Sequence, residues 1–141
     1  MQKVPLPVRG LTSYVGLLVP KSIFIADDSE QARRAIRKLF ESVSSFEICG
    51  EAENGVDALE KVNQLGPDLL ILDFSMPRMS GLEVARRLRE EKNSIRIILF
   101  TWYADVLPPQ HASDLGLTLV SKDAIGSVLV RAATSLLGAS A

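Results

Sequence analysis

Apolar and polar positions follow two different periods along the chain from residue 21 onward. Short runs rich in aliphatic residues predict β-strands at 22–26, 46–52, 69–72, 96–101 and 117–122. The run Leu69-Leu70-Ile71-Leu72 has no polar position, which is typical of a strand buried on both faces of a parallel sheet. Pro77 prevents continuation of the ladder, so Asp73 is predicted to lie at the carboxyl end of a central strand.

Between these runs, apolar residues recur at helical spacing. The spacing predicts helices that begin after Asp28 or Ser29, at 56–65, around 82–88 and at 125–137. Charged residues at 86–92 are interpreted as the solvated face of the third helix. Pro108 and Pro109 fall where a fourth helix should be running, so that helix is predicted to start near Pro109 and to end by Gly116, after about two turns.

Strands that alternate with helices through short connections favour an α/β fold. The predicted architecture is a flavodoxin-like, doubly wound sheet of five parallel strands in the order 2-1-3-4-5, with helices on both faces. In this order strands 1, 3, 4 and 5 are neighbours, so the residues at their carboxyl ends are expected to meet along one rim of the sheet.

The 141 residues and the formal net charge of −1 are ordinary for one globular domain. The charge gives no bulk attraction to nucleic acid or anionic lipid, and no apolar run reaches the length of about 18 residues that a membrane span needs. The single cysteine, Cys49, excludes an internal disulfide and suits a reducing cytoplasm. Because it lies in a strand-like run, it is expected to be a small buried side chain.

The positions of Pro and Gly and the extent of the periodic pattern divide the chain into three segments. Residues 1–20 contain scattered Pro and Gly and are expected to form a poorly ordered extension, since their apolar run is short and has no small-residue cleavage site for a signal peptide. Residues 21–138 form the predicted domain, and 139–141 a tail. Whether an output domain follows residue 141 is left open.

The predicted rim gathers three carboxylates, a hydroxyl and an ammonium group. Strand 1 ends at Asp27 and Asp28, strand 3 at Asp73, strand 4 at Thr101 and strand 5 at Lys122. Crowded carboxylates raise one another's pKa unless a cation lies among them, and an all-oxygen ligand set favours Mg²⁺. A magnesium ion beside a carboxylate nucleophile, opposite an ammonium and a hydroxyl, is an arrangement suited to phosphoryl transfer.

Over residues 21–138 the sequence resembles the receiver domain of two-component response regulators. The resemblance rests on Ile25-Ala26-Asp27-Asp28, Asn54-Gly55, the run from Leu72-Asp73 to Ser80-Gly81, Thr101 and Val120-Ser121-Lys122-Asp123. It implies that Asp73 accepts a phosphoryl group from a histidine kinase or a phosphotransfer protein. It further implies that Asp27, Asp28, Asp73 and the backbone carbonyl of Ser75 hold Mg²⁺, and that Thr101 and Lys122 contact phosphoryl oxygens.

The resemblance also implies partners. Lys122-Asp123 resembles the same position of receivers that precede a helix-turn-helix domain, so the resemblance is compatible with a DNA-binding domain after residue 141. No direct nucleic acid binding is expected of this chain. A homodimer through the fourth helix, the fifth strand and the fifth helix is a further implication. In the family a phosphorylated receiver is a switch, not an enzyme with a separate substrate, and its strand 4 to strand 5 face changes.

Three departures from the family pattern leave alternatives open. Leu119 stands where the family has an aromatic residue, Trp102 follows Thr101 where a small residue is usual, and Pro108 and Pro109 shorten a helix of the output surface. The indole of Trp102 is expected either to overhang the crevice or to lie on the surface of a loop. One alternative is an atypical receiver that signals by partner binding without phosphorylation. The other is an aspartyl-nucleophile phosphatase or phosphotransferase, and a phosphatase of the haloacid-dehalogenase type would need an Asp where Ser75 stands.

Overall fold

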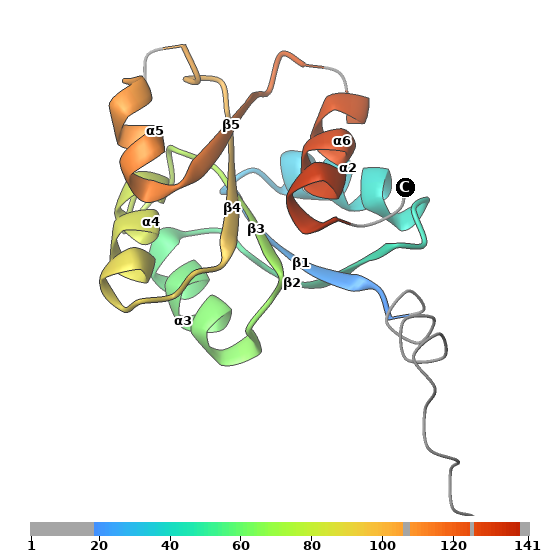
Figure 1. Ribbon diagram of the computed structural model, residues 1–141, viewed down its shortest axis with the longest axis horizontal. Helices are drawn as coiled ribbons and strands as arrows, with labels where there is room; N and C mark the ends of the chain where they lie inside the picture. Colours follow the sequence, from blue (N-terminus) through green and yellow to red (C-terminus); the bar gives the residue numbers. More distant parts are fainter. Residues whose placement is uncertain (1–18, 106–107, 125, 139–141) are drawn as a thin grey trace, which may run out of the picture.

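The computed structural model describes residues 19–105, 108–124 and 126–138. Its strands are β1 (Lys21–Ala26), β2 (Phe46–Ala52), β3 (Leu69–Leu72), β4 (Arg96–Thr101) and β5 (Leu117–Ser121). Its helices are α2 (Glu30–Glu41), α3 (Gly55–Leu65), α4 (Gly81–Glu90), α5 (Pro109–Leu115) and α6 (Gly126–Leu137). The strands form one parallel sheet in the order β2-β1-β3-β4-β5, which confirms the predicted flavodoxin-like architecture (Figure 1).

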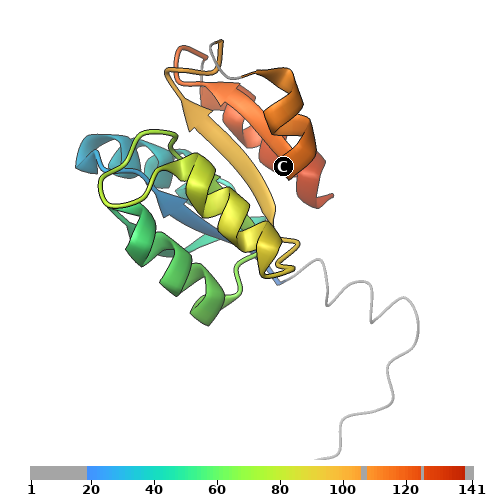
Figure 2. The ribbon, with the colours of Figure 1, turned by 90° about the vertical axis from the view of Figure 1, so that its left-hand side faces the viewer.

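The side chains of the sheet divide between two apolar layers, one on each face. In β1, Phe24 and Ala26 join the layer packed against α3 and α4, whereas Ile23 and Ile25 join the layer packed against α2 and α6. Figure 2 shows α3 and α4 side by side over their face of the sheet. All four residues of β3 are buried, as the aliphatic run predicts for the central strand.

Short polar side chains start three of the helices. Ser29, Asn54 and Ser80 each accept a hydrogen bond from a backbone N–H of the first turn, at distances of 2.9 to 3.2 Å. Of the two predicted caps for α2, the structure selects Ser29. The short helix α5 begins at Pro109 and is followed by Gly116 in the left-handed region, so the prediction for this helix is confirmed.

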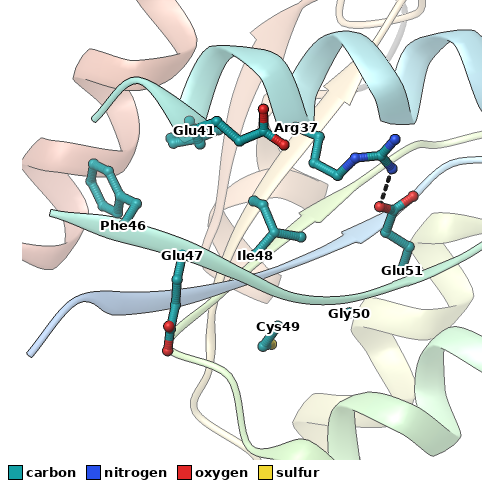
Figure 3. Close-up of a pocket in the computed structure, with 9 residues that line it drawn as sticks. Arg37, Glu41, Phe46, Glu47, Ile48, Cys49, Gly50 and Glu51 are labelled. Carbon is teal, nitrogen blue, oxygen red and sulfur yellow. Dashed lines mark hydrogen bonds and ion pairs between the residues drawn. The ribbon is translucent and has the colours of Figure 1, made fainter. Parts of the chain in front are cut away.

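Two expectations about single side chains are wrong, the burial of Cys49 and the full exposure of Arg89. Cys49 is exposed, because the register between β1 and β2 shifts after Ile23, so that Ile23 pairs with Ile48 but Phe24 with Gly50. Cys49 is the extra residue of this bulge on the edge strand, and Figure 3 shows it on the side opposite Ile48.

Arg89 differs from its exposed neighbours in the charged run of α4. It is partly buried and donates hydrogen bonds of 2.8 to 2.9 Å to three backbone carbonyls, those of Leu115, Asn93 and Ile95. It therefore ties the end of α4 to the end of α5, whereas Arg86 and Arg87 are exposed as predicted.

Some expectations concern residues outside the described part. Residues 1–18, Ile125 and the tail at 139–141 lie outside it, so the extension, the first residue of the last predicted helix and the tail stay predictions. Within the described ranges, no helix has both the length and the apolar character that a membrane crossing requires.

Candidate functional site

The acidic residues predicted at the rim do come together. β1 and β3 are adjacent, and Ala26 pairs with Leu72, so Asp27 and Asp73 follow their strands side by side. Carboxylate oxygens of Asp27, Asp28 and Asp73 lie within 4.8 Å of one another. Asp27 and Asp73 are buried and Asp28 is exposed, so the group opens to solvent on one side.

Asp27 has a partner at every polar atom. Its backbone N–H donates to the carbonyl of Ala52 at 3.1 Å, and its own carbonyl accepts a hydrogen bond of 2.7 Å from Nη1 of Arg33. Its Oδ1 accepts from the backbone N–H of Ser29 at 2.9 Å, and its Oδ2 from Nζ of Lys122 at 2.6 Å. The position and orientation of this carboxylate are therefore fixed by the end of β2, by the start of α2 and by the lysine after β5.

Lys122 lies between the two buried carboxylates. Its Nζ is 2.6 Å from Oδ2 of Asp27 and 3.5 Å from Oδ1 of Asp73, and the lysine side chain is 9% exposed. The residue follows β5 directly and its backbone N–H donates to the carbonyl of Thr101, which aligns it with the end of β4. A single ammonium group is thus shared by two carboxylates.

The charge balance of the pocket is unfavourable to Asp73. Burial raises the pKa of Asp73, the charge of Asp27 raises it further, and Lys122 lowers it in part. A positive charge beside the carboxylates would relieve this repulsion.

The loop after Asp73 is held by close backbone contacts at two glycines. The N–H of Gly81 donates to the carbonyl of Phe74 at 2.8 Å, and a Cβ at Gly81 would lie 1.9 Å from the carbonyl oxygen of Asp73. The N–H of Gly55 donates to the carbonyl of Pro77 at 3.3 Å, and a Cβ there would lie 2.0 Å from the carbonyl oxygen of Met79. These contacts explain why both positions require glycine.

Thr101 is completely buried, but its hydroxyl is directed toward the loop that follows β4. It accepts a hydrogen bond of 3.2 Å from the backbone N–H of Tyr103. Trp102 is 61% exposed, as the surface-loop interpretation predicts. Tyr103 is 50% exposed, and its ring centroid lies 6.1 Å from that of Phe74, the residue after Asp73. Ser75 is exposed two positions after Asp73, and the role expected for its carbonyl stays a prediction.

The sequence did not predict the contact of Arg33 with Asp27, because Arg33 is one of several basic residues on α2 and nothing in their spacing distinguishes it. The available signal is its place in the first turns of the helix that follows Asp27. A long side chain there can reach back to the end of the strand.

The residues present fit a small divalent cation. Among the residues that the structure describes, three carboxylates lie close together, two of them are buried, and one ammonium group contacts them. They form a hard, anionic oxygen set, which Mg²⁺ prefers over softer ligand sets. Asp28 and the solvent beside it leave room for the water ligands that Mg²⁺ usually retains.

Comparisons with known proteins agree with this geometry. The sequence matches the family model of the response regulator receiver domain over residues 23–133. It is 38% identical over 82 residues to the nitrate/nitrite response regulator protein NarL of Escherichia coli K12, a match that covers 58% of this chain and 38% of NarL. It is 40% identical over 80 residues to protein-glutamate methylesterase/protein-glutamine glutaminase 5 of Myxococcus xanthus, covering 57% of this chain and 23% of that protein.

Among solved structures, the chain resembles a DNA-binding response regulator of the LuxR family from Staphylococcus aureus. The TM-score is 0.75 at 29% identity, and the match covers 82% of this chain and 98% of that one. The chain therefore spans well under half the length of the two curated relatives, and nearly all of this solved chain.

Proposed function

The chain belongs to the family of response regulator receiver domains, and on this premise we propose that Asp73 is its phosphoacceptor. Receiver domains are the phosphoaccepting switches of two-component systems, and they interact with kinases or phosphotransfer proteins. The observation that carries the proposal is the position of Asp73. It is a buried carboxylate at the end of the central strand, 3.5 Å from an ammonium group and next to two further acids.

The proposed reaction is transfer from a phosphohistidine of the partner. A carboxylate oxygen of Asp73 attacks phosphorus, an O–P bond forms and the P–N bond breaks. The departing imidazole nitrogen keeps the electron pair and takes a proton from solvent. Lys122 neutralises negative charge on the transferring group, which is the main contribution such a site needs to make.

We assign the divalent cation to Asp27, Asp28, Asp73 and the carbonyl of Ser75. When bound, Mg²⁺ would supply positive charge to the phosphoryl oxygens. Thr101 is proposed to contact the phosphoryl group after its hydroxyl turns away from the N–H of Tyr103. Because that hydrogen bond would be lost, phosphorylation would loosen the loop that leads into α5.

The chain itself is proposed to act as a switch without a separate substrate. Its curated relatives include a methylesterase and a nitrate/nitrite response regulator, but each match covers less than half of that protein. We propose a histidine kinase or phosphotransfer protein as the partner, no direct nucleic acid contact by these residues, and a homodimer through α5, β5 and α6.

The test is phosphorylation of the purified chain by acetyl phosphate with Mg²⁺, followed by intact mass. We expect an adduct of one phosphoryl group, absent in Asp73→Asn and retained in Asp123→Asn, an exposed acid close to the site that serves as the control. Labelling of Asp73→Asn would place the phosphoacceptor elsewhere. Lack of labelling of the wild type, with acetyl phosphate and with a competent phosphohistidine donor, would favour the atypical receiver.

A further inference from the structure

We propose that Arg33 is a positioning residue for the acidic pocket, which holds Asp27 in the orientation that binds the divalent cation. The inference rests on the proposed function, because it concerns the same pocket. The guanidinium of Arg33 contacts Glu51 and the backbone carbonyl of Asp27, so it acts on the pocket through the backbone of Asp27.

The guanidinium of Arg33 joins two strand ends. Nη1 donates to the carbonyl oxygen of Asp27 at 2.7 Å, and Nε donates to Oε1 of Glu51 at 3.1 Å. Glu51 belongs to β2 and pairs with Ile25 of β1 two positions before Asp27. The Arg33 side chain is 14% exposed and that of Glu51 24%, so the pair is protected from much of the screening that weakens surface ion pairs.

Glu51 in turn is held by a second guanidinium. Arg37, one helical turn after Arg33, contacts the other carboxylate oxygen of Glu51, as Figure 3 shows. Arg37 and Glu51 line a hollow of about 570 Å³ between α2 and the edge of β2, away from the acidic group. Glu51 therefore has both oxygens occupied, which sets the orientation of the Arg33 fork toward Asp27.

The carbonyl contact matters because it completes the fixation of Asp27. The backbone N–H of Asp27 donates to Ala52 and its backbone carbonyl accepts from Arg33. The two hydrogen bonds fix the backbone from which the Asp27 side chain extends. Without Arg33, the peptide between Asp27 and Asp28 could rotate, and both expected cation ligands would lose their relative orientation. Partners that orient metal ligands in this way commonly contribute 10- to 100-fold to affinity.

A positioning role and simple electrostatics predict opposite effects of removing Arg33 on the affinity for Mg²⁺. Arg33 carries a positive charge close to a proposed cation site, so by Coulomb repulsion alone its removal would tighten Mg²⁺ binding. If Arg33 positions Asp27, its removal weakens binding instead. Arg37 supplies the matched control, because it carries the same charge on the same helix and contacts the same glutamate, but is not bonded to Asp27.

The experiment is a titration of the unphosphorylated chain with MgCl₂, followed by the backbone amide NMR shifts of Asp27, Asp28 and Asp73. We expect Arg33→Met to weaken Mg²⁺ binding about 10-fold. Arg37→Met should keep or slightly tighten it. Arg33→Lys, which keeps the charge and can donate one hydrogen bond to the carbonyl, should lie between Arg33→Met and the wild type.

A second readout separates positioning from a general structural effect. With acetyl phosphate, the phosphorylation rate of Arg33→Met should fall at low Mg²⁺ and recover most of the wild-type value at saturating Mg²⁺, whereas an unfolded fraction would lower the rate at every concentration. Thermal unfolding checks that each variant is folded. If Arg33→Met does not fold, the Mg²⁺ affinity of Arg33→Lys is the test of the positioning role.

Unchanged or tighter Mg²⁺ binding in folded Arg33→Met would overturn the inference, as would an equal loss in Arg33→Met and Arg37→Met. Failure of the wild type to bind Mg²⁺ at all would overturn the proposed function on which the inference rests. The two failures are therefore distinguishable.

Discussion

The acid side of the site, residues 27–33 and 73–81, can be compared with the α5 side, residues 101–105 and 108–116. On the acid side, every polar atom of Asp27 has a partner, and the backbone around Gly81 is in contact with that of Asp73. On the α5 side, α5 has 7 residues, of which only Ala112 is buried, and it follows a proline whose ring cannot accept a capping hydrogen bond. Its far end is tied down by Arg89.

This difference assigns different tasks to the two sides. A cation site and a nucleophile benefit from fixed geometry, because each displacement of a ligand weakens binding. A short helix with little buried apolar surface opens at low free energy, so it is the natural place for a conformational response. We therefore expect phosphorylation to move the start of α5, and the acid side and the Arg89 end to stay in place.

The largest expected effect is that of Gly81→Ala, on the acid side. The new Cβ would lie 1.9 Å from the carbonyl oxygen of Asp73, so the backbone of one of the two must shift. We expect the free energy of unfolding in urea to fall by about 3 kcal/mol or more.

The control for Gly81→Ala is Gly116→Ala on the α5 side. Gly116 has φ of +65°, and a Cβ there would meet the flexible end of Arg89 at 3.7 Å, so the cost is left-handed strain of about 1–2 kcal/mol. An equal cost at the two glycines would contradict the view that the acid side is the more tightly packed.

Arg89→Met tests whether the end of α5 is anchored. The change removes hydrogen bonds to three carbonyls in a partly buried position, and we expect a loss of about 2 kcal/mol in the free energy of unfolding. Amide exchange in α5 should accelerate more than in α3. The control is Arg87→Met, whose exposed ion pair with Glu83 should contribute less than about 1 kcal/mol. Unchanged exchange in α5 would show that Arg89 does not hold it.

Asp73→Asn is expected to stabilise the chain in the absence of divalent cations. Because the pKa of Asp73 is raised on folding, by burial first and by Asp27 second, the folded state binds its proton more tightly than the unfolded state does. Stability therefore falls as the pH rises from the unfolded pKa of Asp73 to its raised folded pKa, and the full cost is present at higher pH.

The asparagine variant avoids this cost, so its unfolding free energy in EDTA at neutral pH should exceed the wild-type value. The gain should disappear below the ordinary titration range of an aspartate, at about pH 4. Asp123→Asn, at an exposed position, serves as the control. A destabilised Asp73→Asn would mean that Lys122 outweighs burial and the charge of Asp27.

Local chemistry explains which features were predictable from the sequence. The aliphatic run of β3 indicates a central strand by itself, and Pro109 and Gly116 set the bounds of α5 through their own backbone preferences. Asp27 and Asp73 could be placed together because parallel strands end at a common rim.

The features that were missed depend on contacts between distant segments. Arg33 and Arg89 look like neighbouring surface arginines in the sequence, and only the packing of α2 and α4 brings them to backbone carbonyls. Cys49 is exposed because of a shift in the register between β1 and β2, and the residues of β2 alone do not predict that shift. The orientation of the Thr101 hydroxyl likewise depends on the course of the following loop.

The smallest expected effect concerns the aromatic contact that joins the two sides, between Tyr103 and Phe74, the residue after Asp73. The rings are tilted at 55° with centroids 6.1 Å apart, so Tyr103→Ala should cost about 0.5–1.5 kcal/mol. The matched variant Trp102→Ala removes a larger ring that is 61% exposed and should change stability by no more than about 0.5 kcal/mol.

A double-mutant cycle of Phe74→Ala with Tyr103→Ala isolates the contact itself, measured by urea unfolding. A coupling energy near zero would mean that the acid side and the α5 side are energetically independent at this point. In that case the hydrogen bond from the N–H of Tyr103 to the hydroxyl of Thr101 would be the stronger candidate for coupling between the end of β4 and the loop that follows it.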